Sequence, residues 1–382
     1  MKLSRQFVLT SLLLASPAFA QSEQWLTYHT GTEARSYHSV PLTTNAPAGV
    51  ALPKLNAPPY FARWETPMDA NGGRWLCLDR TRKSGPYDTL YIDSNGNGRL
   101  DDETPIMARP DSNFAYFPAT PVVFKGEDGP ISYHLLFRFY KYEKSQAQLL
   151  ASSAGWYEGM VDFDGAKKRL QLIDGNVNGT FNDLAASPYS CDRVQVEGDK
   201  TSERFLGKMI EVDGKFFNLE VARDGAFVKV QPAKNLTFGT VTVADTISEF
   251  AAFGENGHFV RKPAKGELTL PAGRYQIFRW TIERKDDKGA PWTLSGYDFP
   301  ESAGFIAAAD KVAALEIGEP VTATLKVNEQ PKRPIAFDLK FEGRQKEAIE
   351  MLRDNGQRPR GPKLMLAGAD GTTCYTNTFE FG

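Results

Sequence analysis

Short apolar runs alternate with turn residues along most of the chain after residue 60. Typical runs read "RWLCLD", "DTLYID", "YHLLFRFYKY" and "KMIEVDGKFFNLEV", bounded by Gly, Asp, Asn or Pro. Short runs rich in β-branched and aromatic side chains are typical of strands. In the last run, Asp213-Gly214 separates two such stretches and predicts a two-residue hairpin turn. The pattern therefore predicts a mainly β protein.

The pattern also predicts several domains. Residues 21–59 are rich in Pro, Thr, Asn and Ala and show little periodicity, so we expect an irregular lead-in. Residues 60–240 are expected to form an antiparallel β-domain. A composition change near residue 240 is followed by strands spaced about every eight to twelve residues, which predicts an immunoglobulin-like β-sandwich over residues 241–382.

One segment breaks the β pattern. Residues 344–356 read "RQKEAIEMLRDNG", with good helix formers, apolar Ile349 and Leu352 three positions apart, and Gly356 as a C-terminal stop. We expect few short helices in the chain, and this segment is the clearest of them.

The first twenty residues have the pattern of a signal peptide. Lys2 and Arg5 precede an apolar stretch over residues 7–15, and Ala18-Phe19-Ala20 is a small-x-small cleavage pattern. The apolar stretch is too short to span a bilayer, which needs about 20 residues. We expect a signal peptide over residues 1–20, cut after Ala20, no transmembrane anchor, and a periplasmic or secreted protein.

Charge and cysteine content narrow the class further. A formal net charge of −2 supplies no positive field, so no nucleic-acid partner is expected. The three cysteines, Cys77, Cys191 and Cys374, would allow one disulfide in an oxidising compartment, and the sequence leaves open which pair forms, or whether any does. Leu76 and Leu78 flank Cys77, which favours a buried thiol in a strand.

A short acidic loop occurs twice. Residues 92–102 read "IDSNGNGRLDD" and residues 173–183 read "IDGNVNGTFND", identical at six of eleven positions. Both copies follow an apolar, strand-like lead. The repeat indicates an old internal duplication. Asn-Gly pairs also favour type I′ hairpin turns, so a plain turn is the alternative interpretation.

The spacing of oxygen-bearing side chains in these loops suits Ca²⁺. This ion takes six to eight hard oxygen ligands, and a short loop supplies them from side chains at positions 1, 3 and 5 and from the carbonyl at position 7. Gly98 and Gly179 fall at position 6, where the chain must turn sharply. The first loop offers Asp93, Asn95, Asn97 and the carbonyl of Arg99, with Asp101 and Asp102 nearby. The second offers Asp174, Asn176, Asn178 and the carbonyl of Thr180, with Asp183 nearby.

These loops resemble the calcium loops of EF-hands and of dockerin-like modules in secreted bacterial proteins. The resemblance covers about a dozen residues in each copy, and position 12, normally Glu, is Thr104 in the first loop and Ala185 in the second. It implies one or two structural Ca²⁺ ions. Because the first loop carries more carboxylates, we expect it to bind more tightly.

The chain as a whole also resembles large families of uncharacterised exported proteins from environmental bacteria. The residues that carry this likeness are "LYIDSNGNGRLDDE", "GTFND", "LPAGRYQI", "IGEPV" and the closing "FEFG". The likeness implies export and a mainly β fold, and its motifs carry no known activity.

The sequence contains no His-Glu-x-x-His, no Gly-x-Ser-x-Gly and no Gly-x-Gly-x-x-Gly after a strand. We therefore expect a non-enzymatic, exported, calcium-binding protein that acts as a binding or envelope-associated module. Its partner is unknown; a glycan or an envelope component would suit. The alternative is a secreted polysaccharide-acting hydrolase that uses a carboxylate pair, for which Glu65, Glu158 and Glu255 are available.

Overall fold

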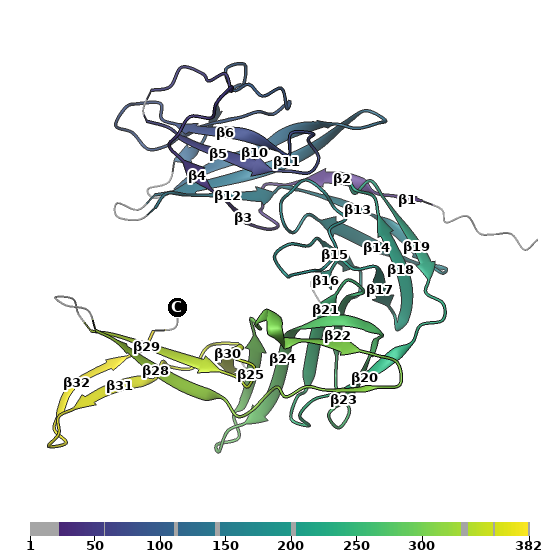
Figure 1. The fold of residues 1–382 in the computed structure, drawn as a ribbon, viewed down its shortest axis with the longest axis vertical. Coiled ribbons are helices and arrows are strands. Elements are labelled where there is room, and N and C mark those ends of the chain that lie inside the picture. Colours follow the sequence, from purple (N-terminus) through teal and green to yellow (C-terminus); the bar gives the residue numbers. More distant parts are fainter. Residues whose placement is uncertain are drawn as a thin grey trace, which may run out of the picture.

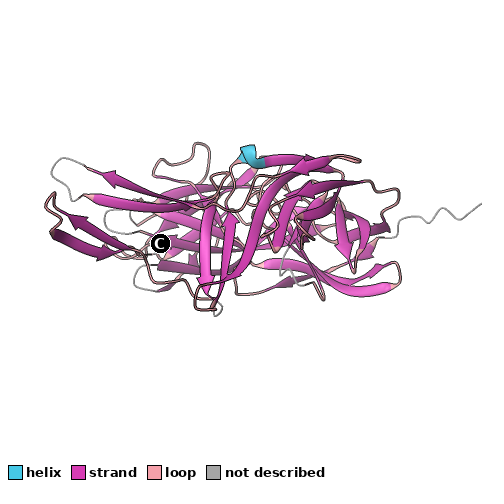
Figure 2. Cartoon of the chain, turned by 90° about the horizontal axis from the view of Figure 1, so that it is seen from below, coloured by secondary structure: helices cyan, strands magenta, loops and turns pink. Residues whose placement is uncertain are grey.

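The computed structural model describes residues 23–56, 58–110, 114–141, 146–199, 204–329, 335–353 and 356–380. Strands account for 54% of the structure and helix for 1%, which confirms the mainly β class (Figure 2). The expected signal peptide and its cleavage point lie outside the described residues. Within them, no helix has the length and apolarity that crossing a membrane requires.

Four antiparallel sheets form the first part of the molecule (Figure 1). One contains, in spatial order, β4 (Leu42–Thr43), β5 (Tyr60–Glu65), β6 (Gly73–Asp79), β7 (Thr89–Ile92) and β8 (Ile106–Met107). The next contains β3 (His38–Val40), β12 (Gln148–Ser153), β11 (Pro130–Tyr140), β10 (Phe114–Lys125) and β9 (Arg109–Pro110). The third contains β16 (Arg204–Phe205), β15 (Arg193–Val196), β14 (Ala166–Ile173), β13 (Gly155–Phe163) and β2 (Thr27–Thr30). The fourth contains β1 (Gln24–Trp25), β19 (Phe227–Pro232), β18 (Lys215–Val221) and β17 (Met209–Val212).

One continuous hydrophobic core lies between these sheets, with buried members from Leu26 to Val228. Its centre is aromatic: the Trp64 and Tyr133 rings stack with centroids 5.7 Å apart. The Trp64 indole also donates a hydrogen bond of 2.6 Å to the carbonyl of Val177, which lies inside the second acidic loop. The core and that loop are therefore directly connected.

The later strands build a sandwich around a second core. Its smaller sheet contains β23 (Glu267–Pro271), β20 (Phe238–Thr242) and β27 (Val312–Ala314). The larger contains β22 (Gly257–Arg261), β21 (Glu249–Gly254), β24 (Gly273–Lys285), β25 (Pro291–Tyr297), β30 (Ala348–Arg353), β29 (Ala336–Glu342) and β28 (Thr322–Asn328), and β26 (Gly304–Ala307) pairs with β24. Side chains from both sheets, including Val241, Leu270 and Trp280, are fully buried against each other. A separate hairpin of β31 (Lys363–Ala367) and β32 (Thr373–Thr378) follows.

A third, smaller cluster joins the two parts. Ala185, Cys191 and Phe205 from the first part pack with Phe253 and Phe278 from the second. The Phe205 ring meets the Phe253 and Phe278 rings edge-on, at centroid distances of 5.3 and 5.0 Å. The two parts therefore share apolar contacts as well as a covalent connection.

The helix expected over residues 344–356 is wrong where the structure describes it. Residues 348–353 form β30, which pairs with β25 along its length. Ile349 and Met351 pack onto the second core, so the apolar period is two rather than three. The described residues contain one helical element, the 3₁₀ turn η1 (Glu301–Ala303).

The structure also answers three other local expectations. The lead-in is less irregular than expected, because β1 to β4 each pair with a strand from later in the chain. The Asp213-Gly214 hairpin is confirmed, with φ angles of 50° and 76° at the two turn residues between β17 and β18. All three cysteines are free thiols; Cys77 and Cys191 are buried, as expected for Cys77, and Cys374 is exposed.

Candidate functional site

Both acidic loops begin directly after a buried strand residue. Ile92 ends β7 and Ile173 ends β14, and both side chains lie in fully buried positions. The next residue in each case, Asp93 or Asp174, is the first position of the loop, and its side chain is also buried. A carboxylate that is held inside a protein needs hydrogen-bond donors or a cation around it.

The first-position carboxylates accept the same backbone hydrogen bonds in both loops. The amides of Asn97 and Gly98 donate to Asp93 at 3.0 and 2.9 Å. In the second loop, the amide of Asn178 donates to Asp174 at 3.3 Å and that of Gly179 at 2.7 Å. Gly98 and Gly179 have φ angles of 78° and 90°, in the left-handed region that favours glycine.

The fifth and tenth positions also match. The side-chain oxygen of Asn97 accepts the Arg99 amide at 2.8 Å, and its Nδ2 donates to Asp102 at 2.7 Å. The corresponding bonds of Asn178, from the Thr180 amide and to Asp183, are both 2.8 Å. A plain hairpin turn requires none of these side-chain contacts. The repeat is therefore a repeat of three-dimensional structure as well as of sequence.

Two of the first loop's four acidic residues turn away from the loop centre. Asp101 pairs with Arg99 at 2.7 Å. Glu103 accepts hydrogen bonds from the amide and hydroxyl of Ser94, at 2.6 and 2.8 Å. The number of carboxylates in the sequence therefore overstates the negative charge that this loop gathers.

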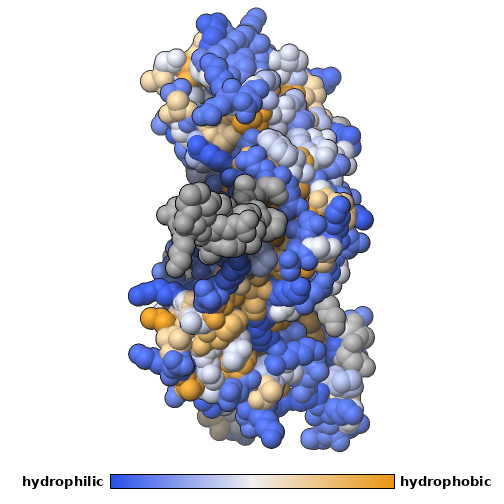
Figure 3. Space-filling view, turned by 90° about the vertical axis from the view of Figure 1, so that its right-hand side faces the viewer, coloured by the Kyte–Doolittle hydropathy of each residue, from blue (hydrophilic) through white to orange (hydrophobic). Residues whose placement is uncertain are grey.

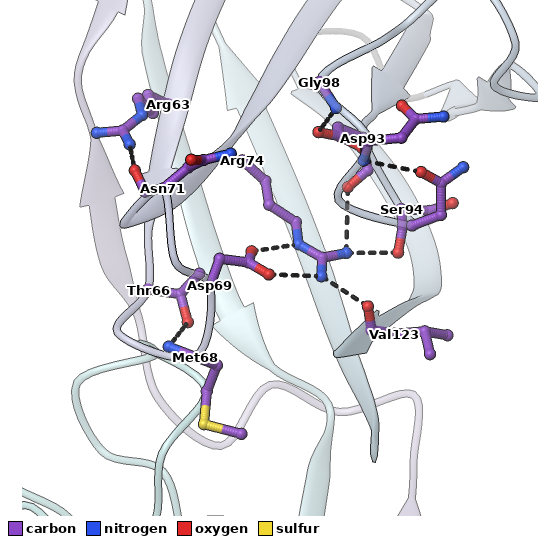
Figure 4. Close-up of polar contacts among 12 residues, drawn as sticks. Arg63, Thr66, Met68, Asp69, Asn71, Arg74, Asp93, Ser94, Gly98 and Val123 are labelled. Carbon is purple, nitrogen blue, oxygen red and sulfur yellow. Dashed lines mark hydrogen bonds and ion pairs between the residues drawn. The ribbon is translucent and has the colours of Figure 1, made fainter. Parts of the chain in front are cut away.

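A buried cation also lies against the first loop. Arg74, 1% exposed, donates to the Asp69 carboxylate at 2.6 and 3.1 Å and to the carbonyl of Asp93 at 3.2 Å (Figure 4). It also donates to the carbonyls of Ser94 and Val123. Although its charge is paired with Asp69, Arg74 already occupies the carbonyl oxygens of Asp93 and Ser94, which are then less available to a metal ion.

The second loop gathers its polar groups around one carboxylate oxygen. Oδ2 of Asp183 accepts hydrogen bonds from Nδ2 of Asn176 at 3.1 Å, Nδ2 of Asn178 at 2.8 Å and the hydroxyl of Thr180 at 2.7 Å. The hydroxyl of Tyr133 donates to Asp174 at 2.8 Å from the neighbouring sheet. Among the residues predicted from sequence, Asn176, Asn178, Thr180 and Asp183 form the most closely bonded group.

Sequence reasoning missed one carboxylate beside the second loop. Asp192 is 1% exposed, and its two oxygens accept the amides of Gly175 and Asp183, at 3.1 and 2.7 Å. Burial raises the pKa of Asp174 to about 6. Burial, with the nearby charge of Asp174, raises the pKa of Asp192 well above its usual value. No spacing rule pointed to Asp192, because it follows the loop motif by several residues.

One acceptor in the second loop has no donor. Oδ1 of Asn176 is buried and has no hydrogen-bond partner among the described residues. It is the one buried side-chain oxygen of the described residues without such a partner. A buried amide oxygen without a partner costs about 1–3 kcal/mol. A hard cation would satisfy it, so the residues present fit a calcium ion at this loop.

The remaining candidates do not form a site with one another. Glu65 pairs with Arg63, Glu158 accepts a hydrogen bond from Gln171, and Glu255 pairs with Lys208. Across the described residues, no group of three or more His, Cys, Asp or Glu side chains is placed to hold a metal. An ion in either acidic loop would therefore rely partly on amide and carbonyl oxygens.

No protein-family model, no curated protein and no solved structure matches this chain. The role of the loops must therefore be inferred from their own geometry and chemistry.

Proposed function

We propose that the chain is an exported, calcium-stabilised protein without catalytic activity that serves as a binding or envelope-associated module. In contrast to the expectation from carboxylate number, the second acidic loop holds the principal Ca²⁺ ion and the first loop a weaker one, because Asp101 and Glu103 of the first loop are bonded to Arg99 and Ser94. Export is supported by the signal-peptide pattern over residues 1–20.

The observation that carries the proposal is Oδ1 of Asn176, at the third position of the loop, which has no hydrogen-bond partner among the described residues. Calcium loops use the side chains at positions 1, 3 and 5 and the carbonyl at position 7. In the second loop these groups belong to Asp174, Asn176, Asn178 and Thr180. Asp183 accepts hydrogen bonds from three of these four residues: Asn176, Asn178 and Thr180. The ion would neutralise the carboxylates and satisfy the amide oxygen.

The role of the ion is structural. The loop follows β14 directly, and Trp64 and Tyr133 from other strands hydrogen-bond to it, so its backbone is held in place. Few charged ligands give weak binding, with a Kd of about 10⁻⁴–10⁻³ M as in extracellular modules. Such an affinity suits a protein that works where calcium is abundant.

The test is calcium binding by the mature chain. After treatment with chelator, addition of ~5 mM Ca²⁺ should stabilise the protein by about 1–2 kcal/mol, which follows from that Kd range. Calorimetry should show saturable heat, and Mg²⁺ should stabilise less because it demands a tighter octahedral shell. The absence of both heat and stabilisation would overturn the proposal.

Variants locate the site. Asp183→Asn should weaken Ca²⁺ binding about tenfold or more, because it removes a charged ligand, whereas Asp102→Asn should have a smaller effect. The matched control is Asp286→Asn, in an exposed turn where Asp286 accepts two backbone amides at 2.9 Å. Equal losses in Asp183→Asn and Asp286→Asn would show that the second loop is not the site.

A further inference from the structure

A groove of about 500 Å³ lies on the outer face of the sheet β3-β12-β11-β10-β9. Side chains alternate between the two faces of each strand. Phe117 and Phe137 point inward and are buried in the first core. Tyr116 and Arg138, the residues beside them, therefore point outward into the groove.

Three side chains form a row across this face. In the strand register, Arg109 of β9 lies opposite Tyr116 of β10, and Tyr116 lies opposite Arg138 of β11. Residues directly opposite on adjacent strands have Cβ atoms about 4.5–5.5 Å apart on the same face. The row thus reads cation, aromatic ring, cation, with the two arginines about 10 Å apart at the backbone.

A second tyrosine covers one end of the row. The guanidinium carbon of Arg138 lies 5.0 Å from the centre of the Tyr37 ring. Tyr37 is 58% exposed and Tyr116 is 39% exposed, so both rings present area to a ligand. The groove therefore offers aromatic surface on either side of Arg138.

Among the described residues, neither arginine of the row has a neutralising partner. No described carboxylate pairs with Arg109 or Arg138, and Nε of Arg138 is buried without an acceptor among the described residues. Elsewhere, arginines beside carboxylates pair with them: Arg204 with Asp199, Arg261 with Glu211 and Arg284 with Glu319. Guanidinium groups bind carboxylates with paired, directional hydrogen bonds, so the groove is complementary to an anion.

The position and charge of the groove exclude two classes of anionic ligand. It lies on a sheet face, where the strands are already paired, so an extended peptide could not add to the sheet there. A net charge of −2 and two arginines do not supply the broad positive surface that nucleic acids need. Aromatic rings flanked by guanidinium groups suit sugar rings that carry carboxylates.

We propose that this groove binds an acidic polysaccharide through successive uronic acid residues, with a carboxylate at each of Arg109 and Arg138 and a sugar ring over Tyr116. Two cations separated by an aromatic ring match a polymer with repeated acid groups better than a single sugar acid. The inference rests on the proposed binding role and names its ligand class, and it does not depend on calcium.

The experiment measures binding of the mature chain to polygalacturonate in chelator, by affinity electrophoresis and calorimetry. The ligand control is the same polymer with its carboxylates methyl-esterified. The wild-type protein should bind the acid form, should bind it more weakly at high salt, and should show no binding to the methyl ester. Binding of the ester as tightly as the acid, or no binding of the acid, would overturn the proposal.

Variants test the row itself. Arg109→Gln/Arg138→Gln should weaken binding at least about tenfold, as expected for lost charge-assisted hydrogen bonds. The matched control, Arg82→Gln/Arg344→Gln, removes the same charge from exposed positions elsewhere and should leave binding unchanged. Equal loss in both double variants, or equally tight binding of polyglutamate, would show attraction by charge alone. Binding of monomeric galacturonate as tightly as the polymer would refute the polymer as ligand.

The same samples separate this inference from the calcium proposal. Each variant is also melted with and without Ca²⁺, which reports on folding and on the acidic loops. Retained calcium stabilisation with no glycan binding in wild type refutes the groove alone. Glycan binding without calcium stabilisation refutes the loops alone.

Discussion

His258 is a buried imidazole whose two ring nitrogens have no hydrogen-bond partner among the described residues. Its ring stacks on Phe205 at 4.7 Å and meets Phe278 edge-on at 5.1 Å. Burial, assisted by the charge of Arg204, lowers its pKa to about 4. The native state therefore keeps this ring neutral over a pH range in which an unfolded chain would protonate it.

This shift predicts acid sensitivity. The unfolded histidine binds a proton below about pH 6.5 and the folded one only below about pH 4, so the free energy of unfolding falls as pH drops through that window. The loss reaches about 3 kcal/mol. His258→Phe keeps the aromatic contact and removes the titration, so its stability should fall less between about pH 7 and pH 4. Chemical denaturation of both proteins across this range measures the difference; parallel profiles would contradict the assignment.

At the acidic loops, some of the residues that lie together could be predicted from the sequence and others could not. The motif predicted Asp174, Asn176, Asn178 and Asp183 together, because local spacing alone positions them. It could not predict Asp192, whose approach depends on how the chain returns before β15. The hydrogen bonds from Ser94 to Glu103 could not be predicted from the sequence either, because they depend on side-chain geometry rather than on position in the motif.

Strand β30 shows why propensity fails for a whole element. Residues 348–353 contain good helix formers, yet pairing with β25 and contact with the second core decide their structure. Most strands, in contrast, have β-branched and aromatic runs with clear turn residues at both ends. The pairing of β1, β2 and β3 with distant strands could not be read from the sequence, because each is only two to four residues long.

The strand assignment of β30 makes a specific prediction. Met351 packs onto the second core, whereas Leu352 is not among the residues that do. Met351→Ser should therefore destabilise the protein by about 1–2 kcal/mol, as expected for a half-buried apolar side chain. Leu352→Ser should cost less. A helix with Ile349 and Leu352 on its inner face would reverse this order, and urea unfolding of the two variants decides between them.

The whole molecule follows an arc in Figure 1, from β3–β12 through β13–β19 to the later strands. On the face drawn in Figure 3, hydrophilic residues cover most of the surface, and hydrophobic ones gather in its lower half, over the later part of the chain. The Phe205 cluster, separate from the two main cores, combines residues of the first and later parts of the chain.

The second acidic loop lies close to that junction along the chain. In the junction cluster, Ala185 lies two residues after Asp183, and Cys191 directly precedes Asp192. The Ala185 amide also donates to the Leu206 carbonyl at 2.9 Å. An ion bound in this loop would therefore hold together the segment through which the first part contacts the second.

The central claim is that the second loop binds a divalent cation, and anomalous diffraction from crystals grown with Tb³⁺ in place of Ca²⁺ tests it most directly. The account predicts an anomalous peak surrounded by oxygens of Asp174, Asn176, Asn178 and Thr180. A protein crystallised at millimolar Tb³⁺ with no peak in that loop would contradict it.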